Sequence, residues 1–101
     1  MICVIATIKA KTGQRNSLLA CIQDNLPNVH AESGCIEYQP MVDIESSLGA
    51  QDLDENNVTI VEKWETMDNL DAHAIAPHML NYREKVKNIV EKVSLKVLTT
   101  A

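Results

Sequence analysis

The sequence predicts one α+β domain, in which two helical regions pack on one face of a four-stranded antiparallel sheet. Three observations lead to this fold class. The 101 residues are enough for one domain and too few for two. Four runs rich in Val, Ile and Thr alternate their side chains between two faces, as strands do. Between them lie two regions in which apolar residues recur every three or four positions, as in amphipathic helices.

The first part of the chain predicts a strand, a helix and a second strand. Residues 2–10 alternate as a strand that is partly buried on both faces. They have no basic leader and no clear cleavage site, so we interpret them as a strand rather than a signal peptide. Residues 14–30 have helical spacing, with a kink or restart expected near Pro27. Residues 35–44 form the second strand, and Pro40 places part of it at a bulge or a sheet edge.

A long polar segment separates the second strand from the third. Residues 45–57 are polar and acidic, which predicts a mobile hairpin connection. Residues 58–65 follow as the third strand, because they are rich in β-branched side chains. Glu62 and Glu65 flank Trp64 at the end of this strand, and both are expected on a solvated face.

The last part of the chain predicts two helices and a closing strand. Thr66 is suited to cap a helix over residues 67–76, because its hydroxyl can accept from a backbone N–H of the first turn. Pro77 ends that helix and can begin the next one, which the apolar spacing carries to about Lys92. Residues 94–99 alternate again and close the sheet as its fourth strand.

The order of these elements is β-α-β-β-α-β, which is the ferredoxin-like arrangement and makes residues 1–101 a single domain. Two helices cover one face of such a sheet, while the other face also carries apolar residues. Pairing two sheets across a two-fold axis would cover that face and form a dimeric α+β barrel. A homodimer is therefore expected, since a domain of this size gains buried area by pairing.

Composition excludes several classes of partner. The net charge is −5 and no block of Lys or Arg occurs, which argues against nucleic acid and anionic membrane surfaces. No apolar run approaches the ~20 residues needed to span a bilayer. Cys3, Cys21 and Cys35 are an odd number with no CxxC pair, so free thiols in a reducing cytoplasm are expected.

The scarce aromatic and imidazole side chains concentrate around the third strand and the helices that follow. Trp64 ends the strand, His73 precedes the Pro77 break, and His78 opens the next helix. Packed as predicted, they would line one apolar cavity between sheet and helices, which is the usual make-up of a small-molecule pocket. The other side chains expected at this cavity are Tyr38, Met41, Met79 and Tyr82.

Each of these residues also has a purely structural interpretation. Trp64 could be a core anchor, His73 a buried histidine with a satisfied hydrogen bond, His78 a cap or surface residue, and Tyr82 part of a helical core stripe. No metal site is predicted, because the two histidines are five positions apart across a helix-breaking proline. No cofactor is predicted either, since the chain has no glycine-rich phosphate loop, Rossmann fingerprint or Walker sequence.

Several segments resemble, in their order and spacing, the antibiotic-biosynthesis-monooxygenase (ABM) family, and most closely the bacterial quinol monooxygenases. The resemblance covers nearly the whole chain. The segments are Val4-Ile5-Ala6, Gly13-Gln14, Gly34-Cys35-Ile36-Glu37-Tyr38, Pro40-Met41-Val42-Asp43, Val61-Glu62-Lys63-Trp64-Glu65, Leu70-Asp71-Ala72-His73 and Pro77-His78-Met79.

The resemblance implies a dimeric α+β barrel that oxygenates quinols or related polycyclic phenols with O₂, without metal or flavin. Trp64 matches the family's pocket tryptophan, and His73 matches its helix histidine, which makes His73 the candidate proton acceptor. Imidazole is suited to that role near neutral pH. His78 and Tyr38 are candidates for hydrogen bonds to the substrate, because such donors can stabilise developing negative charge.

Two other functions stay open at this point. The family includes an isomerase of a phosphorylated signalling sugar, for which Lys9, Lys63 and Arg83 would have to converge on a phosphate. A ligand-binding dimer without turnover is the other, since one fold hosts many functions. Haem breakdown is not expected, because haem-degrading relatives use an Asn on the first strand and residues 2–10 contain none.

Overall fold

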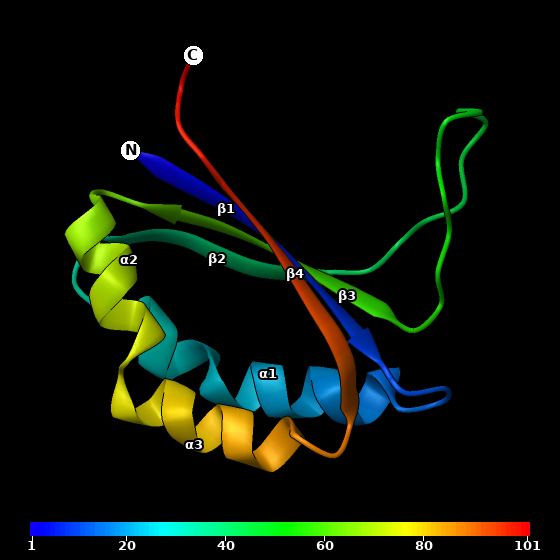
Figure 1. Cartoon of the computed structure of the whole chain (residues 1–101), viewed down its shortest axis with the longest axis horizontal. Helices are drawn as coiled ribbons and strands as arrows, with labels where there is room; N and C mark the ends of the chain where they lie inside the picture. The colour runs from blue at the N-terminus through cyan, green and yellow to red at the C-terminus, as the bar shows by residue number, and fades with distance from the viewer.

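The computed structural model describes residues 1–101 and confirms an α+β fold with four strands and three helices (Figure 1). The second predicted helical region is two separate helices joined at the break before Pro77. The elements in chain order are β1 (Ile2–Ala10), α1 (Arg15–His30), β2 (Cys35–Met41), β3 (Asn57–Trp64), α2 (Met67–Ala74), α3 (Pro77–Val86) and β4 (Val90–Leu98).

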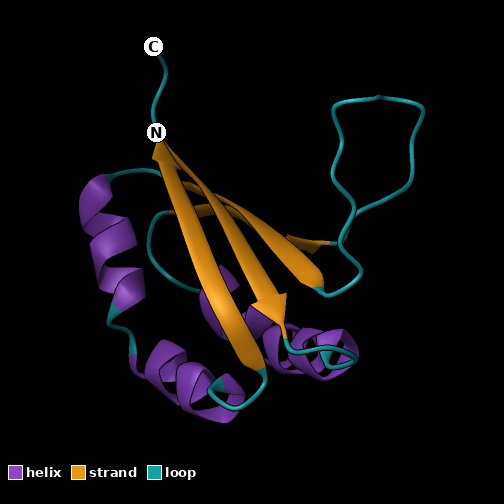
Figure 2. Ribbon diagram, turned by 45° about the vertical axis from the view of Figure 1, so that its right-hand side comes forward, coloured by secondary structure: helices purple, strands orange, loops and turns teal.

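All four strands belong to one antiparallel sheet in the order β2-β3-β1-β4. The three helices lie on the same side of this sheet, and the opposite side carries no helix (Figures 1 and 2). None of the helices is long and apolar enough to cross a bilayer. The predicted ferredoxin-like arrangement is therefore confirmed, and so is the break at Pro77 that separates α2 from α3.

The core forms between the inner sheet face and the helices. On β1 and β3, every second side chain is buried against the helices, which is the period of two that strand geometry imposes. Leu18, Ile22 and Val29 of α1 are buried against this face. Apart from Tyr38, Trp64 and Tyr82, the buried cluster is aliphatic or methionine, as the scarcity of aromatic residues requires.

The end of the chain differs from the sequence prediction. The helix expected to reach Lys92 ends at Val86, and β4 begins at Val90 instead of at residue 94. Ile89 and Val93 continue the helical spacing of α3, but neither residue belongs to that helix. Ile89 lies in the turn, and Val93 pairs with Ile8 of the central strand. Pairing along β1 decided between the two periodicities, as tertiary contacts often do for β-branched residues.

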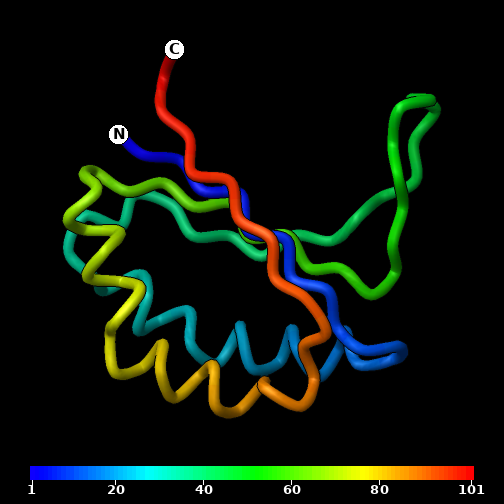
Figure 3. Tube along the Cα trace, in the orientation of Figure 1, coloured from blue at the N-terminus to red at the C-terminus, as the bar shows by residue number.

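The remaining boundaries are close to prediction. α1 is one continuous helix through Pro27, so it does not restart there. β2 is an edge strand, which accommodates Pro40, and it ends at Met41 rather than at residue 44. The Thr66 hydroxyl caps α2 by accepting from the Asn69 N–H at 3.1 Å. The chain between β2 and β3 projects away from the helices (Figure 3).

The strand β4 is not covered by a helix. Val93, Leu95 and Val97 pair with Ile8, Ala6 and Val4 and so share the inner face of the sheet. All three nonetheless remain more than half exposed, while their β1 partners are buried. The helices thus leave an apolar opening beside β4, and this opening leads into the interior.

We expect Leu18→Ala to lower the free energy of unfolding by about 2–5 kcal/mol, because it empties a fully buried position in α1. Urea denaturation followed by circular dichroism measures this. Leu80→Ala is the matched control, since Leu80 is exposed on α3 and its truncation should change stability by no more than about 0.5 kcal/mol. Equal effects of the two substitutions would contradict the core described above.

Candidate active site

A cavity of about 570 Å³ lies between the sheet and the pair α2–α3. This volume is within the ~300–1,000 Å³ typical of small-molecule sites. Of its 20 lining residues, 15 are hydrophobic, so polar groups are few and their positions decide what can bind. The polar and charged lining residues are Glu62, Asp71, His73, Arg83 and Lys87, together with the phenols of Tyr38 and Tyr82.

Four of the predicted site residues line this cavity: His73, Tyr38, Met79 and Tyr82. His78 was also expected there and is not part of the lining. Each of the four lining residues is also buried, with at most 8% of its surface exposed. His73 comes from the last turn of α2, and Tyr38 packs against it with ring centroids 5.4 Å apart. The Tyr82 side chain belongs both to the buried core and to the cavity wall.

Met41 lies elsewhere, so its predicted place at the cavity is wrong. Tyr38 and Met41 are three residues apart on one strand, an odd spacing that puts them on opposite faces. Met41 pairs with Thr59 and is half exposed, whereas Tyr38 pairs with Glu62 and is buried.

Trp64 is fully buried and is absent from the cavity lining. It lies behind His73, with ring centroids 4.7 Å apart, and its indole N–H donates to Oε1 of Glu62 at 3.0 Å. The prediction that Trp64 lines the cavity is therefore wrong. Trp64 instead contacts two residues that do line the cavity and holds them in position.

The environment of Glu62 is the opposite of the one predicted. It was expected on a solvated face, yet it is 4% exposed and lines the cavity from the central part of the sheet. The alternation of β3 explains this, because Val58, Ile60, Glu62 and Trp64 all point inward. Burial raises the pKa of the Glu62 carboxyl, and the Trp64 hydrogen bond and nearby His73 offset part of that rise.

The two cavity phenols keep their protons at neutral pH. Burial raises the pKa of Tyr82 to about 12, and it raises the pKa of Tyr38 further, with the Glu62 charge adding to the effect. Both hydroxyls can therefore donate hydrogen bonds into the cavity.

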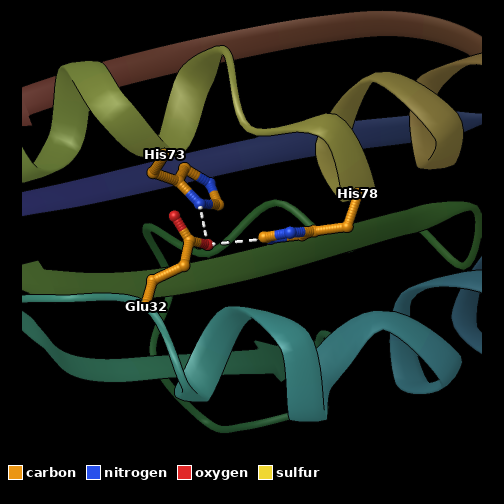
Figure 4. Close-up of side chains that lie close together, drawn as sticks. All are labelled: Glu32, His73 and His78. Atoms are coloured by element: carbon orange, nitrogen blue, oxygen red, sulfur yellow. Dashed lines mark hydrogen bonds and ion pairs between the residues drawn. The ribbon is translucent and has the colours of Figure 1, made fainter.

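Figure 4 shows a second group of side chains, in which His73 and His78 both point at Glu32. A single carboxylate oxygen, Oε2 of Glu32, lies 2.7 Å from Nδ1 of His73 and 3.0 Å from Nε2 of His78. Glu32 comes from the connection between α1 and β2, while the histidines come from α2 and α3. Three separate parts of the chain therefore meet at one oxygen.

This contact fixes which nitrogen of His73 is free. An ionised carboxylate only accepts hydrogen bonds, so Nδ1 of His73 donates and carries the proton. The other nitrogen, Nε2, is left as an acceptor on the side of the ring away from Glu32 (Figure 4). His73 also lines the cavity. An unprotonated imidazole nitrogen can accept a hydrogen bond or a proton.

The same three residues are those that could hold a divalent metal. Their ligand atoms lie within 4.8 Å of one another, even though the sequence spacing of the histidines argued against this. The break at Pro77 turns α3 so that His78 meets His73 again. Ligand atoms around a tetrahedral zinc ion lie roughly 3.3 Å apart. The 2.7 and 3.0 Å contacts at Oε2 are hydrogen-bond distances, so metal binding would require these side chains to separate.

The basic residues proposed for a phosphate site do not converge. Lys63 on β3 lies opposite Cys3 in the strand register, and Lys9 is six positions further along β1 than Cys3. At the rise of a strand, Lys9 and Lys63 are therefore about 20 Å apart. Lys63 forms an ion pair with Glu37. Lys9 forms ion pairs with Asp54 and Glu91. Arg83 lines the cavity and donates to the carbonyl of Ala74. Lys9, Lys63 and Arg83 therefore do not form the phosphate site expected for the phosphosugar isomerase.

Sequence reasoning missed Glu32 altogether and misplaced Glu62. Nothing near Glu32 marks it in the sequence, because its partners are 41 and 46 positions away. Glu62 did carry a signal. It occupies an inward position in the same alternation as Ile60 and Trp64, so the period of the strand could have placed it in the interior.

Comparison with known proteins identifies the family. The family model described as antibiotic biosynthesis monooxygenase matches residues 1–85. The probable quinol monooxygenase YgiN of Escherichia coli K12 is 35% identical over 100 residues, covering 97% of this chain and 96% of the relative. The chain belongs to the antibiotic biosynthesis monooxygenase family. This membership supports a monooxygenase-type function.

Solved structures agree with the fold. PA3566 from Pseudomonas aeruginosa superposes with a TM-score of 0.83 at 22% identity, covering 99% of this chain and 93% of its own. Rv0793 from Mycobacterium tuberculosis superposes with a TM-score of 0.82 at 26% identity, with 99% and 94% covered.

The buried carboxyl of Glu62 predicts a specific pH dependence of stability. Its folded-state pKa is raised, so the folded protein binds this proton more tightly than the unfolded chain does. The contribution of Glu62 is fully present below the unfolded pKa, and it is lost as pH rises toward the folded pKa. Relative to Glu62→Gln, the wild type should therefore lose unfolding free energy above pH 4.5. Urea denaturation of both proteins across this range tests it, and a constant difference would contradict it.

The hydrogen bond from His73 to Glu32 predicts a defined tautomer. In nitrogen-resolved NMR spectra, neutral His73 should carry its proton on Nδ1, because Glu32 accepts there. Glu32→Ala should shift His73 toward the Nε2–H form while leaving the signals of His30 unchanged. An Nε2–H tautomer in the wild type would refute the arrangement.

Proposed function

We propose that this protein is a monooxygenase that oxidises quinols or related polycyclic phenols with O₂. The observation that carries the proposal is the apolar cavity with His73 in its wall, held through Nδ1 by Glu32. A flat aromatic ring suits a cavity lined mainly by aliphatic side chains and methionines. The name of YgiN, a probable quinol monooxygenase, supports the same substrate class.

The proposed reaction balances without an external reductant. A quinol and O₂ give a hydroxyquinone and water, so one oxygen atom enters the ring and the other leaves as water. The substrate supplies the electrons, and we therefore propose that no cofactor takes part. Nε2 of His73 takes a hydroxyl proton, which makes the ring electron-rich enough to react with O₂. The same proton can later be given to the departing oxygen.

The surrounding side chains assist this step. Glu32 stabilises the imidazolium that forms when His73 is protonated, because its carboxylate lies 2.7 Å away. Tyr38 and Tyr82 can donate to a substrate oxygen as negative charge develops there. Met79 contributes apolar contact from α3, and Trp64 and His78 act from behind the wall by holding Glu62, His73 and Glu32.

We further propose that two copies pair through the sheet face opposite the helices, as the ferredoxin-like arrangement suggests. Ile5 and Val61 are paired neighbours on that face and are only partly buried in the single chain. A second sheet would cover them. The three free cysteines agree with a reducing cytoplasm as the location of the protein.

Oxygen consumption with a reduced naphthoquinone and metal-free protein tests the activity. His73→Ala should lower kcat about 100-fold or more, since general-base catalysis contributes ~10²–10⁴-fold. Trp64→Ala should also lower the rate, because it releases His73 and Glu62 from their positions.

The matched control is His30→Gln, which keeps a donor for the carbonyl of Tyr38 and lies outside the cavity lining. It should retain the wild-type rate. If His73→Ala and Trp64→Ala both turn over at the wild-type rate, the assigned site is wrong.

A further inference from the structure

Glu62 is the one buried acidic side chain of this protein, and the proposed proton transfer to His73 does not use it. It stands on the central part of the sheet, with apolar residues before and after it on the inner face of β3. Burying a carboxyl group is unfavourable unless hydrogen bonds or charges compensate it. Its position in the cavity wall therefore calls for an explanation beyond packing.

Only one of the two carboxylate oxygens of Glu62 has a hydrogen-bond partner in the protein. The indole N–H of Trp64 donates to Oε1 at 3.0 Å, and no hydrogen bond from the protein reaches Oε2. Asn57 Oδ1 is the fully buried side-chain oxygen without a hydrogen-bond partner, so Oε2 of Glu62, which has no partner either, keeps some accessible surface. Since Glu62 lines the cavity, this open surface faces the space in which a ligand would lie.

We propose that Glu62 binds a hydroxyl group of the substrate and, with His73, selects dihydroxyaromatic molecules. The inference rests on the proposed function, because it takes the cavity as the substrate site. His73 approaches from α2 and Glu62 from β3, so the cavity presents two acceptors from opposite layers of the fold. A quinol carries two O–H donors, and one can meet each acceptor.

The two acceptors discriminate between ligands by the number of hydroxyl donors that each ligand carries. A phenol with one hydroxyl leaves one acceptor unmet, and a site that hydrogen-bonds a hydroxyl rejects analogues that lack it. A quinone has carbonyl oxygens only, so it offers no donor to the carboxyl of Glu62. The same residue therefore favours the reduced aromatic substrate and disfavours these alternatives.

Anaerobic titration calorimetry at pH 8 tests the inference, with 1,4-naphthalenediol, 1-naphthol and 1,4-naphthoquinone as ligands. The wild type should bind the diol about 10- to 100-fold more tightly than the naphthol, because a hydrogen bond to a charged group contributes about 1.5–3 kcal/mol. Glu62→Met should abolish this preference while retaining binding of the naphthol. Glu65→Gln is the control, since Glu65 is an exposed acidic residue outside the cavity lining and its substitution should keep the preference.

Glu62→Gln serves as a second variant of nearly the same shape, in case the Met substitution prevents folding. Its amide oxygen still accepts but is uncharged, so the preference should fall about fivefold. Equal binding of diol and naphthol by the wild type, or an unchanged preference in Glu62→Gln, would overturn the inference. Since no O₂ is present, a wild type that binds diols selectively but consumes no O₂ would refute only the proposed function.

Discussion

One carboxylate oxygen, Oε2 of Glu32, joins three parts of the chain that are far apart in sequence. It accepts from His73 at the end of α2 and from His78 at the start of α3, while Glu32 itself follows α1. These contacts connect the two helices across the turn before Pro77. They also favour the Nδ1–H tautomer of His73, so the packing of the helices and the hydrogen bonding of this cavity residue depend on the same carboxylate.

The elements of the fold were predictable because their signals are local. Alternation marked the strands, the Thr66 cap marked the start of α2, and Pro77 marked the break between helices. The boundary between α3 and β4 was not predictable in this way. Ile89 and Val93 fit helical spacing as well as they fit their observed places, and only pairing with β1 distinguishes the two.

The candidate site was predictable only in part. His73, Tyr38, Met79 and Tyr82 reach the cavity because the elements that carry them were placed correctly. Glu32 was not predictable, since its partners come from helices more than 40 positions away and depend on the turn at Pro77. Glu62 was misjudged because a charged residue beside other polar ones suggested solvent, although the period of the strand points it inward. A buried carboxyl lowers stability at neutral pH, which is a common consequence of arranging a functional site.

The position of Trp64 has an optical consequence. It is the only tryptophan in the chain, and no part of it is exposed. Its indole donates to Glu62 and packs 4.7 Å from the ring of His73, so the single indole chromophore contacts both acceptors of the cavity wall. Its emission will therefore respond to the charge and hydrogen bonding of these two groups. The protein carries a built-in fluorescent reporter of its own binding site, without any label attached.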